Sequence, residues 1–420
     1  MSLLDLINSE RSRQQEVLQL VASENLPSIH VNNVLNAGFL SWTTVEGRLG
    51  NRFHGGCEII DKIEEMAVRS CQELFDTPEA FVQPVTSSTA NLAIAKIANV
   101  RGSVLSLSTS SGGHISHSRF IHNTYSFDLN EVTHRIDLEQ LRQTIKKTQS
   151  KTLIIGGSSY PREIDFNGIS KICEEFGVLL WADCAHLAGL IAGGLHQSPI
   201  PYCDIITAST YKTMRGPRSG FIMLGHKAVE RFGNSLSKSI HKSIFPGTQS
   251  SSNGCLIAAK AACFQDAMTP EFHKYIESVV LNARTLAARL VNRGIPILTG
   301  GTDTHIVLCD VSKIGINGLS AQMALESVGI LANKNQIPFD TKPVSVTSGL
   351  RLGSNFLTSR GFSDEDFIKI ADIVADVLLA INSRSEKTMD YEQIRMNVKA
   401  ISATRPIPTE LLSAFQHDDL

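Results

Sequence analysis

The sequence predicts an α/β protein in which a mostly parallel β-sheet is covered by helices on both faces. Short apolar runs, typical of strands buried on both sides, occur at residues 104–107, 178–183 and 220–224. Segments with helical spacing of apolar residues alternate with them, such as 166–176, which is followed by Gly177. This alternation is typical of a sheet packed between two helical layers. A chain of 420 residues is long enough to add a second, smaller domain.

The N-terminal part of the chain is predicted to be helical, with one polar loop. Apolar residues at helical spacing over 3–21 predict a helical arm, and a second helix should end near Leu40. Residues 46–56 are too rich in glycine for a helix and too charged for a core strand, so we expect a loop there. A further amphipathic helix has an apolar stripe formed by Ile60, Ile63, Ala67, Cys71 and Leu74.

The remaining pattern predicts a large and a small α/β domain. Further strands are expected at 153–155, 205–208, 295–299, 306–309 and 350–352, and helical segments at 256–292, 319–328 and 364–379. From about Ser385 the chain is polar and then carries closely spaced prolines, which favours a loosely packed or subunit-clasping extension. The predicted limits are 1–25 for a helical arm, 26–255 for the large domain, 256–384 for the small domain and 385–420 for the extension.

Composition excludes several classes of protein. Hydrophobic residues make up 42% and charged residues 19%, as in an ordinary soluble globular protein, and the net charge of −2 favours neither nucleic acid nor an anionic membrane. The eight cysteines have no CxxC spacing, so neither a zinc site nor a disulfide framework is expected. The mixed-charge N-terminus lacks the apolar core of a signal peptide, which favours a cytoplasmic location.

Three segments carry residues suited to holding a phosphorylated aromatic aldehyde. Small hydroxyl residues at 85–91 precede a helix, where free N–H groups attract an anion, although a simple N-cap would look the same. Asp183 ends an apolar strand, where a doubly wound sheet places ligands, although a structural ion pair is the alternative. Lys212 follows the strand at 205–208; burial there would favour the neutral amine that attacks a carbonyl, and a surface lysine is the alternative.

Other residues complete a set that points to one cofactor. His114 follows two glycines and could stack on an aromatic ring, Arg351 could grip a carboxylate by two parallel bonds, and Glu46 could exchange a proton. Each has an ordinary structural explanation when taken alone. Together with the three segments above they describe pyridoxal 5′-phosphate acting on an amino acid.

Motifs along residues 14–382 resemble one family in order. The segments ASEN, GNRFHGGCEIID, VQPVTSSTAN, GGHISHS, WADCAHLAGL, TASTYKTMRGPR, FPGTQ and SGLRLGS resemble serine hydroxymethyltransferases. The resemblance implies a pyridoxal-phosphate-dependent transferase of fold type I, with a mostly parallel seven-stranded sheet in the large domain and a smaller C-terminal α/β domain. It also implies a homodimer, or a tetramer built from such dimers, with an active site shared between subunits and a small amino acid as substrate.

The resemblance assigns roles position by position. Lys212 matches the Schiff-base lysine, and the implied catalytic residues are Lys212, Glu46, His114 and Asp183. The implied cofactor-binding residues are Ser87, Ser88, His114, Ser158, Asp183, His186, Ser209 and Lys212, with Gly247 and Thr248 contributed by the second subunit. The implied substrate-binding residues are Ser23, Glu46, His54 and Arg351. No metal is implied.

Departures from the family pattern leave the reaction open. Phe53 and His54 stand where the family has a tyrosine pair, and Thr44 stands where it has another tyrosine. One expectation is hydroxymethyl transfer between serine and glycine with tetrahydrofolate, whose use the sequence leaves undecided. A second is folate-free chemistry at the same carbon, by a threonine aldolase, transaldolase, racemase or aminotransferase. A third is a catalytically idle, cofactor-binding partner protein.

Overall fold

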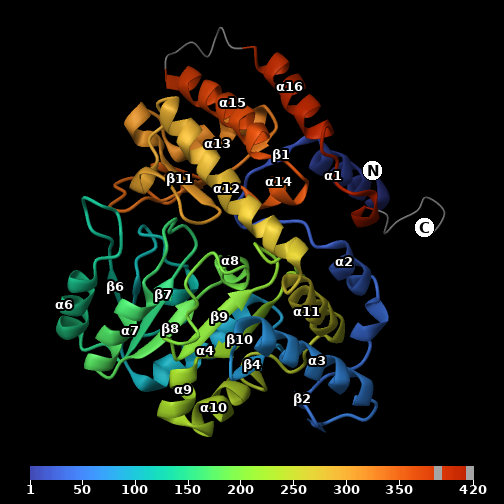
Figure 1. Cartoon of the computed structure of the whole chain (residues 1–420), viewed down its shortest axis with the longest axis vertical. Helices are drawn as coiled ribbons and strands as arrows, with labels where there is room; N and C mark the ends of the chain where they lie inside the picture. Colours follow the sequence, from blue (N-terminus) through green and yellow to red (C-terminus); the bar gives the residue numbers. More distant parts are fainter. Residues whose placement is uncertain (383–389, 413–420) are drawn as a thin grey trace. The chain divides into compact units, whose positions relative to one another are not determined.

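Contacts divide the chain into two compact units (Figure 1). The computed structural model describes residues 1–382 and 390–412. Unit 2 is Pro27–Ile276, and unit 1 combines Met1–Leu26 with Glu277–Leu420. The division after Ile276 differs from the limit at 255 expected from sequence, because α11 (Gly254–Ala267) packs against α2 (Ile29–Leu35) and α3 (Glu58–Phe75) of unit 2.

Unit 2 is built on a seven-stranded sheet with the order β4-β10-β9-β8-β7-β5-β6. Its strands are β4 (Glu79–Phe81), β5 (Val104–Leu107), β6 (Thr124–Phe127), β7 (Thr152–Gly156), β8 (Leu179–Asp183), β9 (Ile205–Ser209) and β10 (Gly220–Leu224). Strand β10 runs antiparallel to β4 and β9, and the other neighbours are parallel. The predicted mostly parallel sheet is therefore confirmed, although sequence reasoning missed its two edge strands, β4 and β6.

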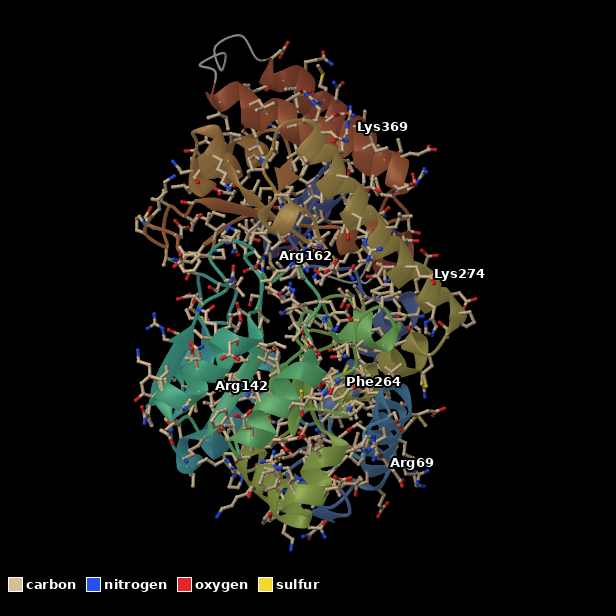
Figure 2. All side chains as sticks on the ribbon, turned by 60° about the vertical axis from the view of Figure 1, so that its left-hand side comes forward. Arg69, Arg142, Arg162, Phe264, Lys274 and Lys369 are labelled. Carbon is tan, nitrogen blue, oxygen red and sulfur yellow. The ribbon has the colours of Figure 1, made fainter. Side chains whose placement is uncertain are left out.

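Helices cover both faces of this sheet, because successive side chains of a buried strand point to opposite sides. On one face α4 (Ser87–Arg101) and α10 (Asn234–Ile244) share a core with Trp181 and Ile222. On the other, Phe221 packs against Phe264 of α11, with ring centroids 5.1 Å apart. Figure 2 labels Phe264 of α11, together with Arg69 of α3 and Arg142 of α6 (Leu138–Thr148), all in unit 2.

The other elements of unit 2 connect the strands. They are η1 (Gly38–Ser41), the short hairpin β2 (Gly47–Arg48) and β3 (Asn51–Arg52), α5 (Ser116–Arg119), α6 (Leu138–Thr148), α7 (Phe166–Glu175), α8 (Ala188–Ala192) and α9 (His226–Phe232). The hairpin lies in the segment predicted as a loop. Each parallel strand from β5 to β9 ends at the same edge of the sheet, which is where its following loop begins.

Unit 1 has a three-stranded antiparallel sheet in the order β11-β14-β13. Its strands are β11 (Ile306–Asp310), β13 (Asn333–Asn335) and β14 (Gly349–Gly353), and its helices include α12 (Pro270–Asn292, which begins in unit 2), α13 (Gly318–Ser327), α14 (Asn355–Ser359) and α15 (Asp364–Asn382). One apolar core joins these helices to the sheet. This second, smaller α/β unit agrees with the fold class predicted from sequence.

Two sequence expectations in unit 1 were wrong. The N-terminal helix α1 (Leu3–Glu16) stops before residue 21, because β1 (Leu18–Gln19) pairs in parallel with β12 (Ile330–Leu331). The strand expected at 295–299 is a short 3-10 turn, η2 (Leu298–Gly300), because Thr299 has a φ of 62°.

Of the two expectations for the C-terminal extension, loose packing or clasping of a second subunit, the first is wrong for residues 390–412, which are packed; the second stays a prediction. Helix α16 (Tyr391–Ala403) contacts α1, and Val398 on it is 1% exposed. The buried Arg360 guanidinium binds the carbonyls of Val17, Ser402 and Arg405. Residues 385–389 and 413–420 of the predicted extension lie outside the described residues. Over residues 1–382 and 390–412, no helix combines the length and apolar character needed to cross a membrane.

Candidate active site

A buried polar cluster surrounds Asp183 at the end of β8. Asp183 is 2% exposed, and its Oδ2 lies 2.8 Å from Nε2 of His117. The same oxygen accepts a 2.9 Å hydrogen bond from Asn91 Nδ2, and Oδ1 accepts one of 3.1 Å from the Ala185 amide. Three donors therefore hold a carboxylate that has almost no contact with water.

The electrostatics of this cluster keep Asp183 ionised. Burial by itself would raise the pKa of Asp183. The hydrogen bond and charge of His117, followed by the charges of His114 and Lys212, outweigh burial and hold that pKa well below its usual range. The structure thus brings three of the predicted site residues, Asp183, His114 and Lys212, within electrostatic reach of one another.

Lys212 lies three residues beyond β9, in a loop fixed by hydroxyl groups. Its side chain is 5% exposed, so it is not the surface lysine that sequence alone allowed. Ser209, the last residue of β9, donates from Oγ to the Ala185 carbonyl at 2.7 Å. The loop that carries His186 is linked in turn, because Thr213 Oγ1 donates to the His186 carbonyl at 3.3 Å.

The loops after β5 and β7 approach each other closely, which places Ser158 near the His114 loop. The Ser158 amide donates to the Gly112 carbonyl at 2.7 Å. A Cβ on Gly157 would lie 2.0 Å from that same carbonyl oxygen, so only glycine permits this approach. His114 Nδ1 lies 2.7 Å from the Ser116 hydroxyl, which fixes the rotation of the imidazole.

The predicted phosphate seat is the first turn of α4. Thr86 is the N-cap, and its hydroxyl accepts a 3.0 Å bond from the Thr89 amide. Ser87 and Ser88 begin the helix, where N–H groups and the positive dipole end favour an anion. Asn91 lies one turn further along and binds Asp183, so this helix connects the seat to the buried acid.

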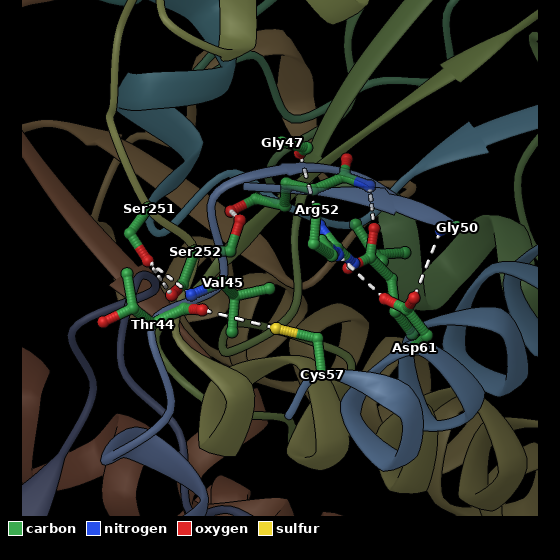
Figure 3. A network of polar contacts seen from close by, with 12 residues as sticks. Thr44, Val45, Gly47, Gly50, Arg52, Cys57, Asp61, Ser251 and Ser252 are labelled. Carbon is green, nitrogen blue, oxygen red and sulfur yellow. Dashed lines mark hydrogen bonds and ion pairs between the residues drawn. The ribbon is translucent and has the colours of Figure 1, made fainter. Parts of the chain in front are cut away.

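Glu46 and His54 form a pair on the β2–β3 hairpin. Their Oε2 and Nε2 atoms are 2.9 Å apart, and both side chains are partly exposed. The hairpin is anchored by Arg52, which binds the Gly47 carbonyl at 3.2 Å and Asp61 Oδ1 at 2.8 Å (Figure 3). Sequence reasoning placed both residues in one loop but did not predict their contact.

Gly247 and Thr248 lie beside α4, away from its first turn. The Gly247 carbonyl accepts a bond from Lys96 in the third turn of α4, and Thr248 is bonded to Ile244 at the end of α10. This placement within one chain leaves the expectation that these residues serve a second subunit as a prediction.

Ser23 and Arg351 belong to unit 1. Arg351 lies in β14, is 8% exposed, and donates from Nε to Asn333 Oδ1 at 3.0 Å. Gly353, two residues further, donates to the Leu20 carbonyl at 2.7 Å, and a Cβ on it would lie 2.4 Å from the Cα of Ala22. The segment leading to Ser23 therefore packs against the end of the strand that carries Arg351.

The donor set in unit 2 fits pyridoxal phosphate. An ionised Asp183 can hold a proton on a pyridine nitrogen, a helix N-terminus with serines suits a phosphate, and a buried lysine amine can bond to an aldehyde. Two buried atoms of the same cluster, Asn91 Oδ1 and His117 Nδ1, lack a hydrogen-bond partner in the described structure. Unsatisfied polar atoms are costly in a core and are typical of a ligand site.

Sequence reasoning missed Asn91 and His117, although both contact Asp183. Their signals were weak: Asn91 is a polar residue in an apolar helix, and His117 lies three residues after His114. No local sequence pattern predicts that His117 or Asn91 contacts Asp183, which lies 66 and 92 residues further along the chain, respectively.

A seven-stranded, mostly parallel sheet with a buried lysine and an ionised aspartate at its strand ends defines a pyridoxal-phosphate-dependent transferase of fold type I. The family model described as serine hydroxymethyltransferase matches residues 1–374. This chain belongs to the serine hydroxymethyltransferase family.

Two relatives illustrate the similarity. The serine hydroxymethyltransferase of Prochlorococcus marinus strain MIT 9515 is 43% identical over 382 residues, which cover 89% of this chain and 88% of the relative. That of Zymomonas mobilis is 40% identical over 417 residues, which cover 97% of this chain and 95% of the relative. The similarity therefore extends over both units.

Proposed function

We propose that this protein binds pyridoxal phosphate and breaks the Cα–Cβ bond of serine, the reaction for which its relatives are named. The observation that carries the proposal is the buried Asp183, held ionised by His117 and by the charges of His114 and Lys212. Such a group is costly in a core unless it has a cationic partner. Beside His117, the protonated ring nitrogen of the bound cofactor would supply a second cationic partner.

Each residue has a distinct task in this proposal. The cofactor, when bound, supplies a ring that withdraws electrons from the substrate Cα. Asp183 would hold the proton on the ring nitrogen, and the Lys212 amine would hold the cofactor's aldehyde and serve as a proton carrier at the substrate Cα. Arg351 binds the substrate carboxylate. Glu46 would take the proton from the β-hydroxyl as the Cα–Cβ bond breaks, and the formaldehyde released would pass to tetrahydrofolate.

The cofactor assignment is tested by replacing Lys212 with alanine. Wild-type protein supplied with pyridoxal phosphate should develop a visible absorbance band, and Lys212→Ala should not. Lys227→Ala provides the matched control, because Lys227 is a partly exposed lysine of unit 2 that pairs with Glu174. A Lys212→Ala protein that retains the wild-type band and turnover would contradict the assignment.

A second candidate is folate-free cleavage of a larger β-hydroxy amino acid such as threonine. The observation that favours it is the altered pocket: His54, which stands where the family has a tyrosine, lies 2.9 Å from Glu46, the proposed base for the β-hydroxyl. The base would take the hydroxyl proton, the Cα–Cβ bond would break to release acetaldehyde, and a proton delivered to Cα would give glycine. The test compares the absorbance change of the glycine-loaded protein with and without tetrahydrofolate. A large folate-dependent rise would favour the first candidate, and acetaldehyde release from threonine the second.

We further propose that the protein is a homodimer whose subunits complete each other's sites. Large apolar side chains are exposed around the Glu46 hairpin, with Phe39 60%, Trp42 85% and Phe53 73% exposed. A patch of this kind on a protein surface favours a protein partner. Light scattering should give twice the chain mass, and Trp42→Glu should lower it. A monomeric wild-type protein would contradict the proposal.

A further inference from the structure

A lysine with no role in the proposed reaction lies buried beneath the predicted phosphate seat. Lys260, on α11, is completely buried. Its ammonium group donates to the carbonyls of Val82, of Pro84 at 3.0 Å and of Gly220 at 3.1 Å. Burial lowers the pKa of Lys260 to about 7. Burying a cation is costly, so this arrangement needs a reason beyond filling space.

The three carbonyls belong to the two segments that form the seat. Val82 and Pro84 follow β4 and lead into Thr86, the N-cap of α4. Gly220 begins β10, and a Cβ there would lie 2.4 Å from the Thr86 oxygen and 2.6 Å from the Ser87 amide nitrogen. One ammonium group therefore fixes the turn before Ser87 against the strand beside it. Ser219 adds a 3.1 Å bond from its hydroxyl to the Pro84 carbonyl.

The charge of Lys260 is balanced by a buried network. Glu64 is fully buried and accepts hydrogen bonds from Arg52 and from Gln83. Gln83 lies between Val82 and Pro84, whose carbonyl groups accept hydrogen bonds from Lys260. The Glu64 charge acts to raise the pKa of Lys260, in opposition to burial. Arg52 also binds Asp61, so two cations face two carboxylates. Removing the Lys260 charge would leave this network with an excess negative charge near the seat.

We propose that Lys260 is a positioning residue for the phosphate seat: it holds the Pro84–Thr86 turn so that the first amides of α4 and the hydroxyls of Ser87 and Ser88 converge on the cofactor phosphate. The inference rests on the proposed function, since it concerns how the same cofactor is held. It assigns Lys260 no contact with cofactor or substrate.

The test compares pyridoxal phosphate with pyridoxal, which lacks the phosphate. Both are titrated into cofactor-free wild-type and Lys260→Met protein, and binding is followed by absorbance. The variant removes the three donors while keeping similar volume. We expect Kd for pyridoxal phosphate to rise roughly tenfold, about 1.4 kcal/mol, while Kd for pyridoxal stays within about twofold of wild type. A general loss of stability would weaken both.

Two further variants make the outcome decisive. Arg231→Leu is the matched control, because it breaks the partly buried pair with Asp204 just before β9, away from the seat. It should leave the preference for the phosphorylated form unchanged. Ser219→Ala removes the 3.1 Å bond to the Pro84 carbonyl and should give a smaller phosphate-selective loss even if Lys260→Met does not fold. If wild-type protein binds pyridoxal phosphate but neither Lys260→Met nor Ser219→Ala loses affinity for it selectively over pyridoxal, the inference about Lys260 is overturned and the proposed function is not. Wild-type protein that takes up neither compound would overturn the proposed function as well.

Discussion

Replacing His117 with leucine would test whether the ionised state of Asp183 depends on its buried partner. His117 is 1% exposed, and its Nε2 atom lies 2.8 Å from Asp183 Oδ2. Leucine keeps an apolar group beside Trp181 but removes the donor and the charge. Loss of one partner from a buried pair costs about 3–5 kcal/mol, because the other group stays buried without compensation. We expect the free energy of unfolding at pH 7 to fall by about that amount.

The pH dependence gives this prediction its sign. The pKa of Asp183 in the folded wild type lies below the ordinary value of 3.8. The carboxylate therefore contributes stability that is present above pH 3.8 and is lost as pH falls through the folded pKa. In the variant, burial would raise this pKa and the carboxyl would take up a proton more readily. The difference between wild type and variant should shrink as pH falls toward 4.

Urea unfolding of the cofactor-free protein at several pH values measures both effects. His226→Leu is the control, because His226 forms an exposed pair with Asp76 at 3.7 Å and should cost less than about 1 kcal/mol. A His117→Leu protein that loses less than about 1 kcal/mol at pH 7, or the same amount at every pH, would refute the reasoning.

Three other predictions concern single positions. Gly220→Ala should lower the free energy of unfolding by about 1–3 kcal/mol, since its Cβ would lie 2.4 Å from the Thr86 oxygen, whereas Gly38→Ala, with nothing within 4 Å, should be nearly neutral by the same denaturant assay. Arg360→Met should speed amide hydrogen exchange throughout α16, because Arg360 holds that helix through backbone carbonyls; unchanged exchange would contradict this. The pKa of Lys260 is about 7 in the folded protein, against an ordinary value of 10.5 for a lysine in water. Between pH 7 and pH 10.5, unfolding is therefore accompanied by the uptake of a proton. Wild-type stability should therefore rise relative to that of Lys260→Met by up to about 1.4 kcal/mol per pH unit above pH 7, and a parallel pH dependence would contradict it.

The sequence alone determined the α/β class and the identity of several core strands. Strands β5 and β10 have the limits that their apolar runs predicted. A strand that is buried on both faces needs an unbroken run of apolar residues, which a half-exposed strand or helix does not. The positions of Lys212 and Asp183 at strand ends likewise predicted buried polar groups, and both side chains are buried, while their catalytic roles stay a prediction. Hydrophobic patterns report how deeply a segment is buried, so elements whose burial is strong and local can be predicted from it.

Only the tertiary structure decided which polar groups meet inside that core. Nothing in the local pattern around Asn91, His117 or Lys260 indicates a partner, since each contacts residues at least 40 positions away. The same limit explains the N-terminal error: residues 18–19 have a helical apolar pattern, but pairing with β12 satisfies their backbone groups as a strand. Burial is recorded locally in a sequence, whereas hydrogen-bond partners are chosen by the path of the whole chain.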